Sequence, residues 1–144
     1  VPIATPEGGA KLTNCNNAGD PGTPPVFGDI TSDQMTEEPS GIKIFDTTVG
    51  NGESPGEGDF VCVHYTGWLS DGSEFDSSYG RGEATGFSVG GVIPGFRDAI
   101  LGMSTGGQRR VEIPADQAYG AAGAGGLIPP NATLVFDIVL DSFK

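Results

Sequence analysis

Side chains that commonly carry out covalent or acid–base chemistry are scarce in this chain. Among its 144 residues are one histidine, His64, and two cysteines, Cys15 and Cys62. These are too few for a zinc site made of protein ligands alone, so neither a metal nor a cofactor is expected. The cysteines allow one disulfide in an oxidising compartment or, equally, two free thiols.

Two short motifs suggest chemistry that their surroundings do not support. Residues 102–106, Gly-Met-Ser-Thr-Gly, have the spacing of a hydrolase nucleophile elbow, which needs a strand before it and a later histidine. Here an amphipathic helix is expected before the motif, and His64 comes earlier in the chain. We interpret the motif as a helix end and a turn. The glycosylation sequon at 131–133 lies between two prolines and an apolar strand, so Asn131 is interpreted as a turn residue.

A tyrosine and a glycine-rich loop form the most distinctive stretch of the chain. Tyr119 follows a strand that ends at Ile113, and four glycines lie between positions 120 and 126. Glycines permit backbone angles that other residues avoid, so this segment is expected to be an irregular loop between two strands rather than a helix or a strand. Leu127 and Ile128 then precede two prolines, which suits an apolar lip over a cavity.

The elements around this stretch are read from hydrophobic spacing and turn signals. Pro94 begins the one predicted helix, residues 94–103, and Gly102 favours its end. Alternation and turn residues predict strands near 42–49, 60–66, 74–76, 87–89, 108–113 and 133–140. About five antiparallel strands and one helix predict an α+β fold, a half-barrel sheet wrapped around the helix. Alternation directs Cys62, His64, Arg110, Glu112 and Asp137 away from the core.

The first 40 residues differ from the rest in composition. They hold six of the 11 prolines and five glycines, with apolar residues scattered without a period. Such a segment cannot offset its ordering entropy alone, so it needs its own domain or a partner. We predict an irregular extension over 1–40, a possible tether to a membrane-protein complex, and a folded domain over 41–144.

Charge and chain ends limit the partners and the compartment. The net charge is −12, of which residues 1–40 contribute six acidic and one basic side chain. Acidity this evenly spread repels phosphate backbones, so nucleic acid is not an expected partner. The sequence opens with Val1 rather than Met, which suggests a mature form after removal of a leader.

Five motifs, in order, resemble the FK506-binding-protein (FKBP) family of peptidyl-prolyl isomerases. The resemblance covers residues 41–144, nearly the length of an FKBP domain. They are residues 63–67 (Val-His-Tyr-Thr-Gly), 75–78 (Phe-Asp-Ser-Ser), 92–95 (Val-Ile-Pro-Gly), 118–120 (Ala-Tyr-Gly) and 128–136 (Ile-Pro-Pro-Asn-Ala-Thr-Leu-Val-Phe). The run Ser-Ser-Tyr-x-Arg-Gly at 77–82 looks most like bacterial and chloroplast members. Without this resemblance, the aromatic residues would be interpreted as plain core.

The resemblance implies a site for a proline-containing segment or an FK506-like macrolide. Residues of the reacting site would be Tyr65, Phe75, Asp76, Ile93, Tyr119 and Phe136. Further binding contacts would come from Arg81, Val92, Phe96, Leu127 and Ile128. In the family, the Ile93 amide and the Tyr119 hydroxyl donate hydrogen bonds to ligand carbonyls, and Asp76 receives a polar ligand group and is braced by Tyr65 and Arg81.

Three departures from the family pattern bear on activity. Phe96 stands where most members have a tryptophan floor. Thr85 replaces a frequent aromatic at the pocket edge, and the segment before Val92 is shorter. The expected function is a peptidyl-prolyl cis–trans isomerase. The alternative is a weakly catalytic or non-catalytic FKBP-like subunit docked in a larger, possibly photosynthetic, complex. The expected compartment is the chloroplast thylakoid lumen, with the periplasm or secretion as alternatives.

Overall fold

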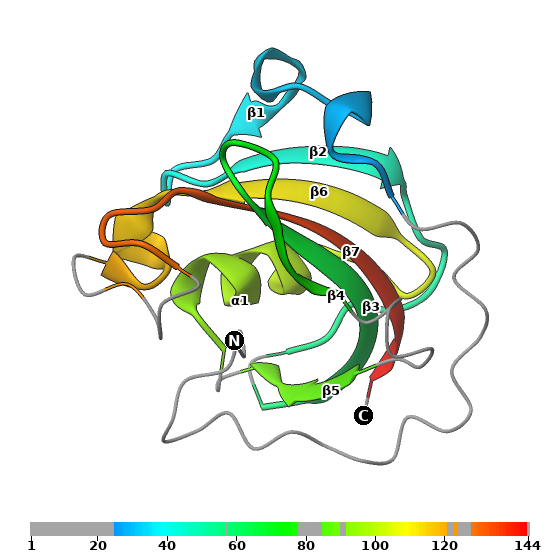
Figure 1. Ribbon diagram of the computed structural model, residues 1–144. Coiled ribbons are helices and arrows are strands. Elements are labelled where there is room, and N and C mark those ends of the chain that lie inside the picture. Colours follow the sequence, from blue (N-terminus) through cyan, green and yellow to red (C-terminus); the bar gives the residue numbers. More distant parts are fainter. Residues whose placement is uncertain are drawn as a thin grey trace.

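The computed structural model describes residues 25–56, 58–77, 85–89, 92–120, 123 and 128–143. Within these ranges a seven-stranded antiparallel sheet curves around one α-helix, which lies in its hollow (Figure 1). The predicted α+β class is therefore confirmed. The described part of the extension contains two short 3₁₀ turns and one two-residue strand.

The strand order places the last long strand in the middle of the sheet. The order is β1 (Thr36–Glu37), β2 (Lys43–Thr48), β6 (Gln108–Ile113), β7 (Leu134–Phe143), β3 (Phe60–Leu69) and β4 (Glu74–Ser77). Two strands share the edge of β3 that faces away from β7. Strand β5 (Thr85–Ser88) pairs with the first half of β3, and β4 pairs with its second half. An Asp-Gly turn joins β3 to β4, as predicted, with Gly72 at φ 94°.

Helix α1 (Pro94–Leu101) begins at Pro94 as the sequence predicts and ends two residues before the predicted end, with Gly102 as its C-cap. Ile93 has the extended ψ of 148° usual before proline, and at the end of the helix the Met103 amide donates to the Ile100 carbonyl at 2.9 Å. The helix packs against β6, where a Cβ at Gly95 would lie 2.4 Å from Cγ2 of Ile113. A glycine is therefore required for the helix to approach the sheet this closely.

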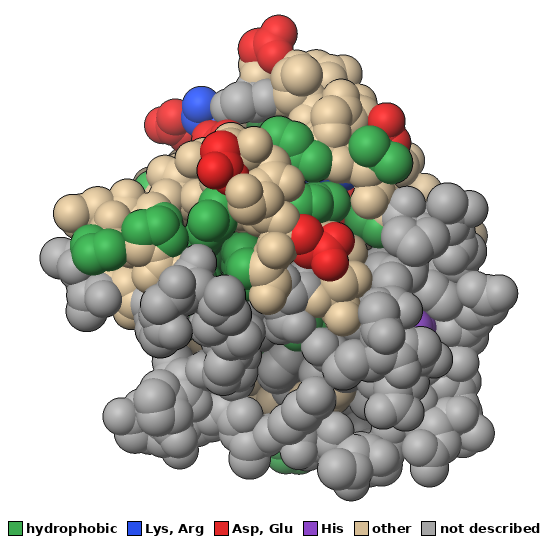
Figure 2. Space-filling view, viewed as in Figure 1, with side chains coloured by type: hydrophobic (Ala, Val, Ile, Leu, Met, Phe, Trp, Pro, Cys, Tyr) green, Lys and Arg blue, Asp and Glu red, His purple; other side chains and the backbone are tan. Residues whose placement is uncertain are grey.

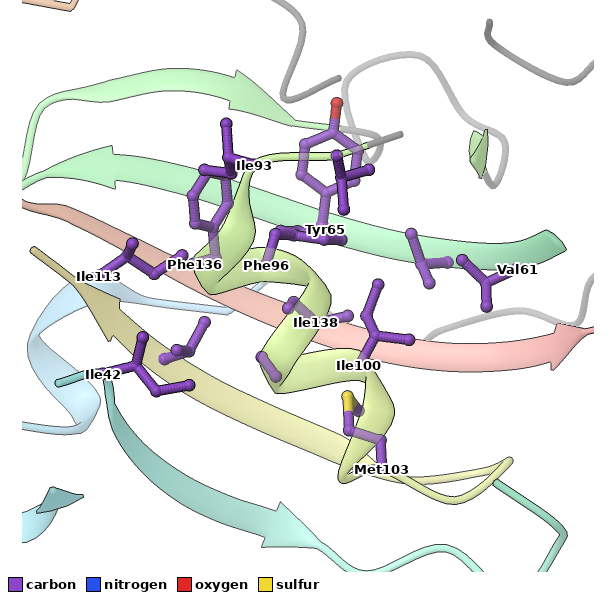
Figure 3. Packing of buried hydrophobic residues seen from close by; sticks show 14 of the residues in the cluster. Ile42, Val61, Tyr65, Ile93, Phe96, Ile100, Met103, Ile113, Phe136 and Ile138 are labelled. Carbon is purple, nitrogen blue, oxygen red and sulfur yellow. The ribbon is translucent and has the colours of Figure 1, made fainter. Parts of the chain in front are cut away.

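The hydrophobic core lies between the helix and the concave face of the sheet (Figure 3). Alternate residues of β3, β6 and β7 face it, together with one side of α1. Its fully buried members include Val61, Val63, Phe96, Ala99, Ile100, Val111, Ile113, Leu134, Phe136, Ile138 and Leu140. The periodicities of about 3.6 and 2 residues read from the sequence account for this set.

Arg109 fastens the end of the helix to the sheet. Its Nε and Nη2 donate to the Asp46 carboxylate at 2.6 and 3.2 Å. Its Nη1 donates to the Ala99 carbonyl at 3.0 Å, and Nη2 also donates to the Gly102 carbonyl at 3.1 Å. A cation at this end also complements the negative end of the helix dipole.

Replacing Arg109 with methionine is expected to lower the free energy of unfolding by about 2–3 kcal/mol, because charge-assisted hydrogen bonds to buried carbonyls are lost. Urea denaturation checks this value. Arg97→Met, a substitution on α1 itself, is the matched control. The Arg97 side chain is more than a third exposed, and its Nε lies 3.7 Å from Oδ1 of Asp98. Equal losses in the two variants would contradict a specific role for Arg109.

Both chemically suggestive motifs are turns, as interpreted from the sequence. Residues 102–106 follow α1 directly, and Gly106 has a φ of 91°. Asn131 has a φ of 59°, and its amide donates to the Gly120 carbonyl at 2.9 Å. Because a helix precedes residues 102–106, the strand–turn–helix geometry of a nucleophile elbow is absent there. Asn131 lies in a turn rather than in a strand.

Cys62, on the outer side of β3, is in a disulfide bond. The partner suggested by the sequence, Cys15, lies outside the described residues. In the described ranges, no helix combines the length and apolar character needed to cross a membrane.

Candidate functional site

Four aromatic rings from four different elements meet at one end of the core. Phe136 of β7 is central: its ring centroid lies 5.3 Å from Phe96 of α1, 5.6 Å from Phe75 of β4 and 6.4 Å from Tyr65 of β3. Tyr65 also lies 6.1 Å from Phe96. Three of these pairs meet nearly edge to face, the geometry that aromatic quadrupoles favour.

The entrance to α1 adds aliphatic side chains to this aromatic cluster. Val92 and Ile93 are 4% and 2% exposed and immediately precede Pro94. Figure 3 shows Ile93, Tyr65, Phe96 and Phe136 together near the start of the helix, while Met103 lies at its other end. The Tyr65 hydroxyl points away from the helix in this view. Pairing in the sheet and the fixed start of α1 thus bring together residues that are 71 positions apart in sequence.

Gly67 provides the space in which two of the rings pack. A Cβ at this position would lie 2.7 Å from Cε1 of Phe136 and 2.7 Å from Cζ of Phe75. Gly67 belongs to one of the family motifs, but the motif alone does not indicate this role. A glycine inside a strand that is otherwise apolar was the available signal, because such glycines mark close approach.

Tyr119 and Ile128 lie at the border of the same core. Tyr119 is half-buried against the cluster, after η5 (Ala115–Gln117). Ile128 is 2% exposed and belongs to the buried core, so it is more enclosed than a lip residue would be. The backbone at Gly123 lies against the backbone at Ile128, since a Cβ at Gly123 would lie 2.3 Å from the Ile128 carbonyl oxygen.

Some predicted site residues cannot be placed. Arg81 and Leu127 lie outside the described residues, as do 78–84 and 90–91 around the shortened segment. The Asp76 backbone pairs with Gly67 in the ladder between β4 and β3, but its side chain is outside the description. The structure therefore brings together Tyr65, Phe75, Val92, Ile93, Phe96 and Phe136, with Tyr119 and Ile128 adjacent.

On the described surface in Figure 2, acidic side chains are scattered rather than gathered into one patch. At the β3–β4 turn, the hydrogen bond from the Ser73 amide lowers the pKa of Asp71. The cluster itself contains hydrocarbon surface and tyrosine hydroxyls, which suits non-covalent binding of an apolar ring with a few oriented hydrogen bonds.

Comparison with known proteins identifies the family. The model of the FKBP-type peptidyl-prolyl cis-trans isomerase family matches residues 51–141. An FK506-binding protein of Neisseria meningitidis is 45% identical over 102 residues, which are 69% of this chain and 94% of the relative. FkpA of Escherichia coli, an FKBP-type peptidyl-prolyl cis-trans isomerase, is 50% identical over 95 residues, 66% of this chain. The match spans only 35% of FkpA, so this chain corresponds to a part of that relative.

Solved structures agree with the sequence comparison. The crystal structure of AtFKBP13 superposes with a TM-score of 0.72 at 40% identity, covering 76% of this chain and 98% of the other. The crystal structure of Escherichia coli FkpA gives 0.74 at 43% identity, covering 77% of this chain and 52% of the other. With more than half of the chain matched by the family model and the same fold in its relatives, the chain belongs to the FKBP-type peptidyl-prolyl cis-trans isomerase family.

Proposed function

We propose that the chain catalyses cis–trans isomerisation of Xaa-Pro bonds in protein segments, with the aromatic cluster as the prolyl site. The observation that carries this proposal is the packing of Tyr65, Phe75 and Phe96 around Phe136 at the entrance of α1. Tyr65, Phe75 and Phe136 are family motif positions, and Phe96 stands at the position of the family's tryptophan. Four separate elements contribute these rings, whose apolar side chains suit contact with a proline ring. The substrates are proline-containing segments, and FK506-like macrolides would compete for the same surface.

The mechanism follows from the physics of the amide. Rotation breaks C–N resonance, with a barrier of about 18–20 kcal/mol and an unaided time of about tens to hundreds of seconds. The twisted amide is less dipolar than the planar one, so removing water disfavours the planar ground state more than the transition state. Oriented donors then hold the chain as it turns. We assign desolvation to the aromatic cluster, and positioning to the Ile93 amide, Tyr119 and Asp76.

The remaining binding residues have supporting roles in this proposal. Val92 would belong to the wall and Phe96 to the floor of the site. Arg81 would brace Asp76, and Leu127 with Ile128 would form the loop lip. Phenylalanine at position 96 is smaller than the tryptophan usual in the family, which favours a shallower contact and a lower rate. Exchange of a Leu-Pro peptide between cis and trans, with and without FK506, tests the proposal. Acceleration that FK506 abolishes supports it, and a folded protein without acceleration refutes it.

Phe136→Tyr and Asp76→Val are each expected to lower kcat/KM about tenfold or more, a loss of roughly 1.4 kcal/mol of transition-state stabilisation. The tyrosine would add a hydroxyl where the side chain is completely buried among rings. Phe60→Tyr is the matched control, because Phe60 is 42% exposed on the same sheet and its hydroxyl would reach water. Unchanged rates in both site variants would overturn the assignment of the site.

We also propose a division of labour along the chain, with activity in 41–144 and attachment through 1–40. The disulfide of Cys62 supports an oxidising compartment. The thylakoid lumen and the periplasm both meet that requirement, and the bacterial relatives support the periplasm. A membrane-protein complex remains the partner proposed for the extension, and cross-linking through an introduced photoreactive residue in 1–24 would test it.

A further inference from the structure

The outer face of the sheet, opposite α1, holds polar side chains that ought to be in water. Strand alternation directs Trp68, Arg110 and Asp137 away from the core, yet they are 4%, 1% and 2% exposed. Arginine and aspartate are almost never this buried unless paired and covered. The outward direction predicted for Arg110 and Asp137 is therefore confirmed, but another part of the chain covers both side chains.

The cover is the segment Val26–Asp29 of the N-terminal extension, which includes η1 (Phe27–Asp29). Arg110 donates from Nη1 to the Phe27 carbonyl and from Nη2 to the Val26 carbonyl, both at 3.0 Å. The Phe27 ring lies 5.6 Å from Trp68 at an angle of 68°. Figure 1 shows this segment on the side of the sheet away from α1.

The groups that hold the segment are themselves held by the sheet. The Asp137 carboxylate accepts from Arg110 Nε at 3.1 Å and from Gln108 Nε2 at 2.7 Å. The Arg110 guanidinium carbon also lies 4.7 Å from the centroid of the Trp68 ring. These contacts fix the guanidinium so that its two terminal nitrogens face a peptide backbone. Two successive carbonyls and one aromatic ring are what such a surface recognises.

The hairpin turn completes the binding surface. A Cβ at Gly72 would lie 3.3 Å from Cδ2 of Phe27, so the turn backbone packs directly on that ring. The Phe27 ring is therefore bounded by Trp68 on one side and the β3–β4 turn on another. An aromatic residue fits here, whereas a small one would leave the Trp68 ring uncovered.

We propose that this outer face is a second peptide-binding site, separate from the prolyl site, and that its ligand is the chain's own segment Val26–Asp29. The site takes a peptide that is extended at Val26 and turns into a 3₁₀ helix at Phe27. Two consecutive carbonyls bind Arg110, and one aromatic side chain packs on Trp68. Filled in this way, it fixes the extension to the face opposite α1.

Trp68 makes the site directly observable, because it is the only tryptophan of the chain. In the full-length protein, Phe27→Ala should shift Trp68 emission to longer wavelength, at least double its quenching by acrylamide, and speed hydrogen exchange of the 26–29 amides at least tenfold. Phe60→Ala, an exposed position on the same strand, is the matched control and should change none of these. Isomerase activity should be unaffected by Phe27→Ala.

A peptide added in trans distinguishes a binding site from ordinary packing. A synthetic peptide of residues 25–32, added to full-length Phe27→Ala protein, should restore the emission in a saturable way. The titration should reach about 5 mM, above the millimolar effective concentration of a short tether. The same peptide with alanine at position 27 should have no effect. Unchanged Trp68 emission in Phe27→Ala, or no recovery with the wild-type peptide, would overturn the proposal.

Discussion

Replacing Arg110 with methionine is expected to lower the free energy of unfolding by about 3–5 kcal/mol at pH 7, the largest effect on stability that we foresee. The Arg110 and Asp137 side chains are each 1% exposed, so the variant would leave a buried carboxylate without its cation. Two carbonyl contacts and the stacking on Trp68 would be lost as well. Chemical denaturation followed by circular dichroism measures the change.

The loss in the free energy of unfolding caused by Arg110→Met should become smaller as the pH falls. Burial raises the pKa of Asp137 above the ordinary value of 3.8, and hydrogen bonds from Gln108 and Arg110 and the charge of Arg110 oppose the increase. Without Arg110 the folded-state pKa rises further, so the folded protein binds this proton more tightly than the unfolded chain does. Stability lost at neutral pH therefore returns as the pH falls through the raised pKa towards 3.8.

A double variant separates an unpaired charge from a general loss of packing. Arg110→Met with Asp137→Leu removes both charges, and apolar replacement of a buried pair is often neutral or stabilising. We expect the double variant to recover most of the loss while Val26–Asp29 remains undocked. A double variant as unstable as the single one would show that the ion pair is not the cause.

Substitution of Gly67 by alanine should have the largest effect on activity, a decrease in kcat/KM on the order of 100-fold. The added methyl would lie 2.7 Å from both Phe136 and Phe75, so the two rings must move. Displacements of about 1 Å in a positioned site can cost a factor of this size. Initial rates with a Phe-Pro peptide, measured well below the unfolding transition, provide the test.

Gly58→Ala is the matched control for this prediction, because nothing lies within 4 Å of the position of its Cβ. The control should keep the wild-type rate, whereas Gly67→Ala should keep its secondary structure and lose activity. Retention of full activity in a folded Gly67→Ala protein would show that the spacing of the rings is not critical for the reaction.

Local patterns were sufficient to predict the helix and the inner face of the sheet. Phe96, Ala99, Ile100 and Met103 recur at helical spacing, and all four are buried between α1 and the sheet. The turn at Gly72 and the stop at Gly102 could be predicted because their chemistry is local. The role of Gly67 could not be derived in this way, because it depends on rings contributed by β4 and β7.

The outer face shows where such patterns fail. Alternation correctly directs Arg110 and Asp137 away from the core, but it cannot reveal that a segment more than 80 residues earlier covers them. Val26 and Phe27 lie in a proline-rich stretch without periodicity, so no repeating signal marks them. Strand β1 has only two residues, which is too short for a repeating hydrophobic pattern. Both features depend on pairing between distant parts of the chain.

The docking of an acidic segment on an acidic domain has a consequence for its dependence on salt. Residues 1–40 carry six acidic and one basic side chain, and residues 41–144 carry thirteen acidic and six basic ones, so the two parts repel at long range. The attractive contacts are short and buried around Arg110, where ions screen them little. Because salt screens charges about 10 Å apart at 0.1 M, raising the ionic strength should tighten this attachment rather than release it.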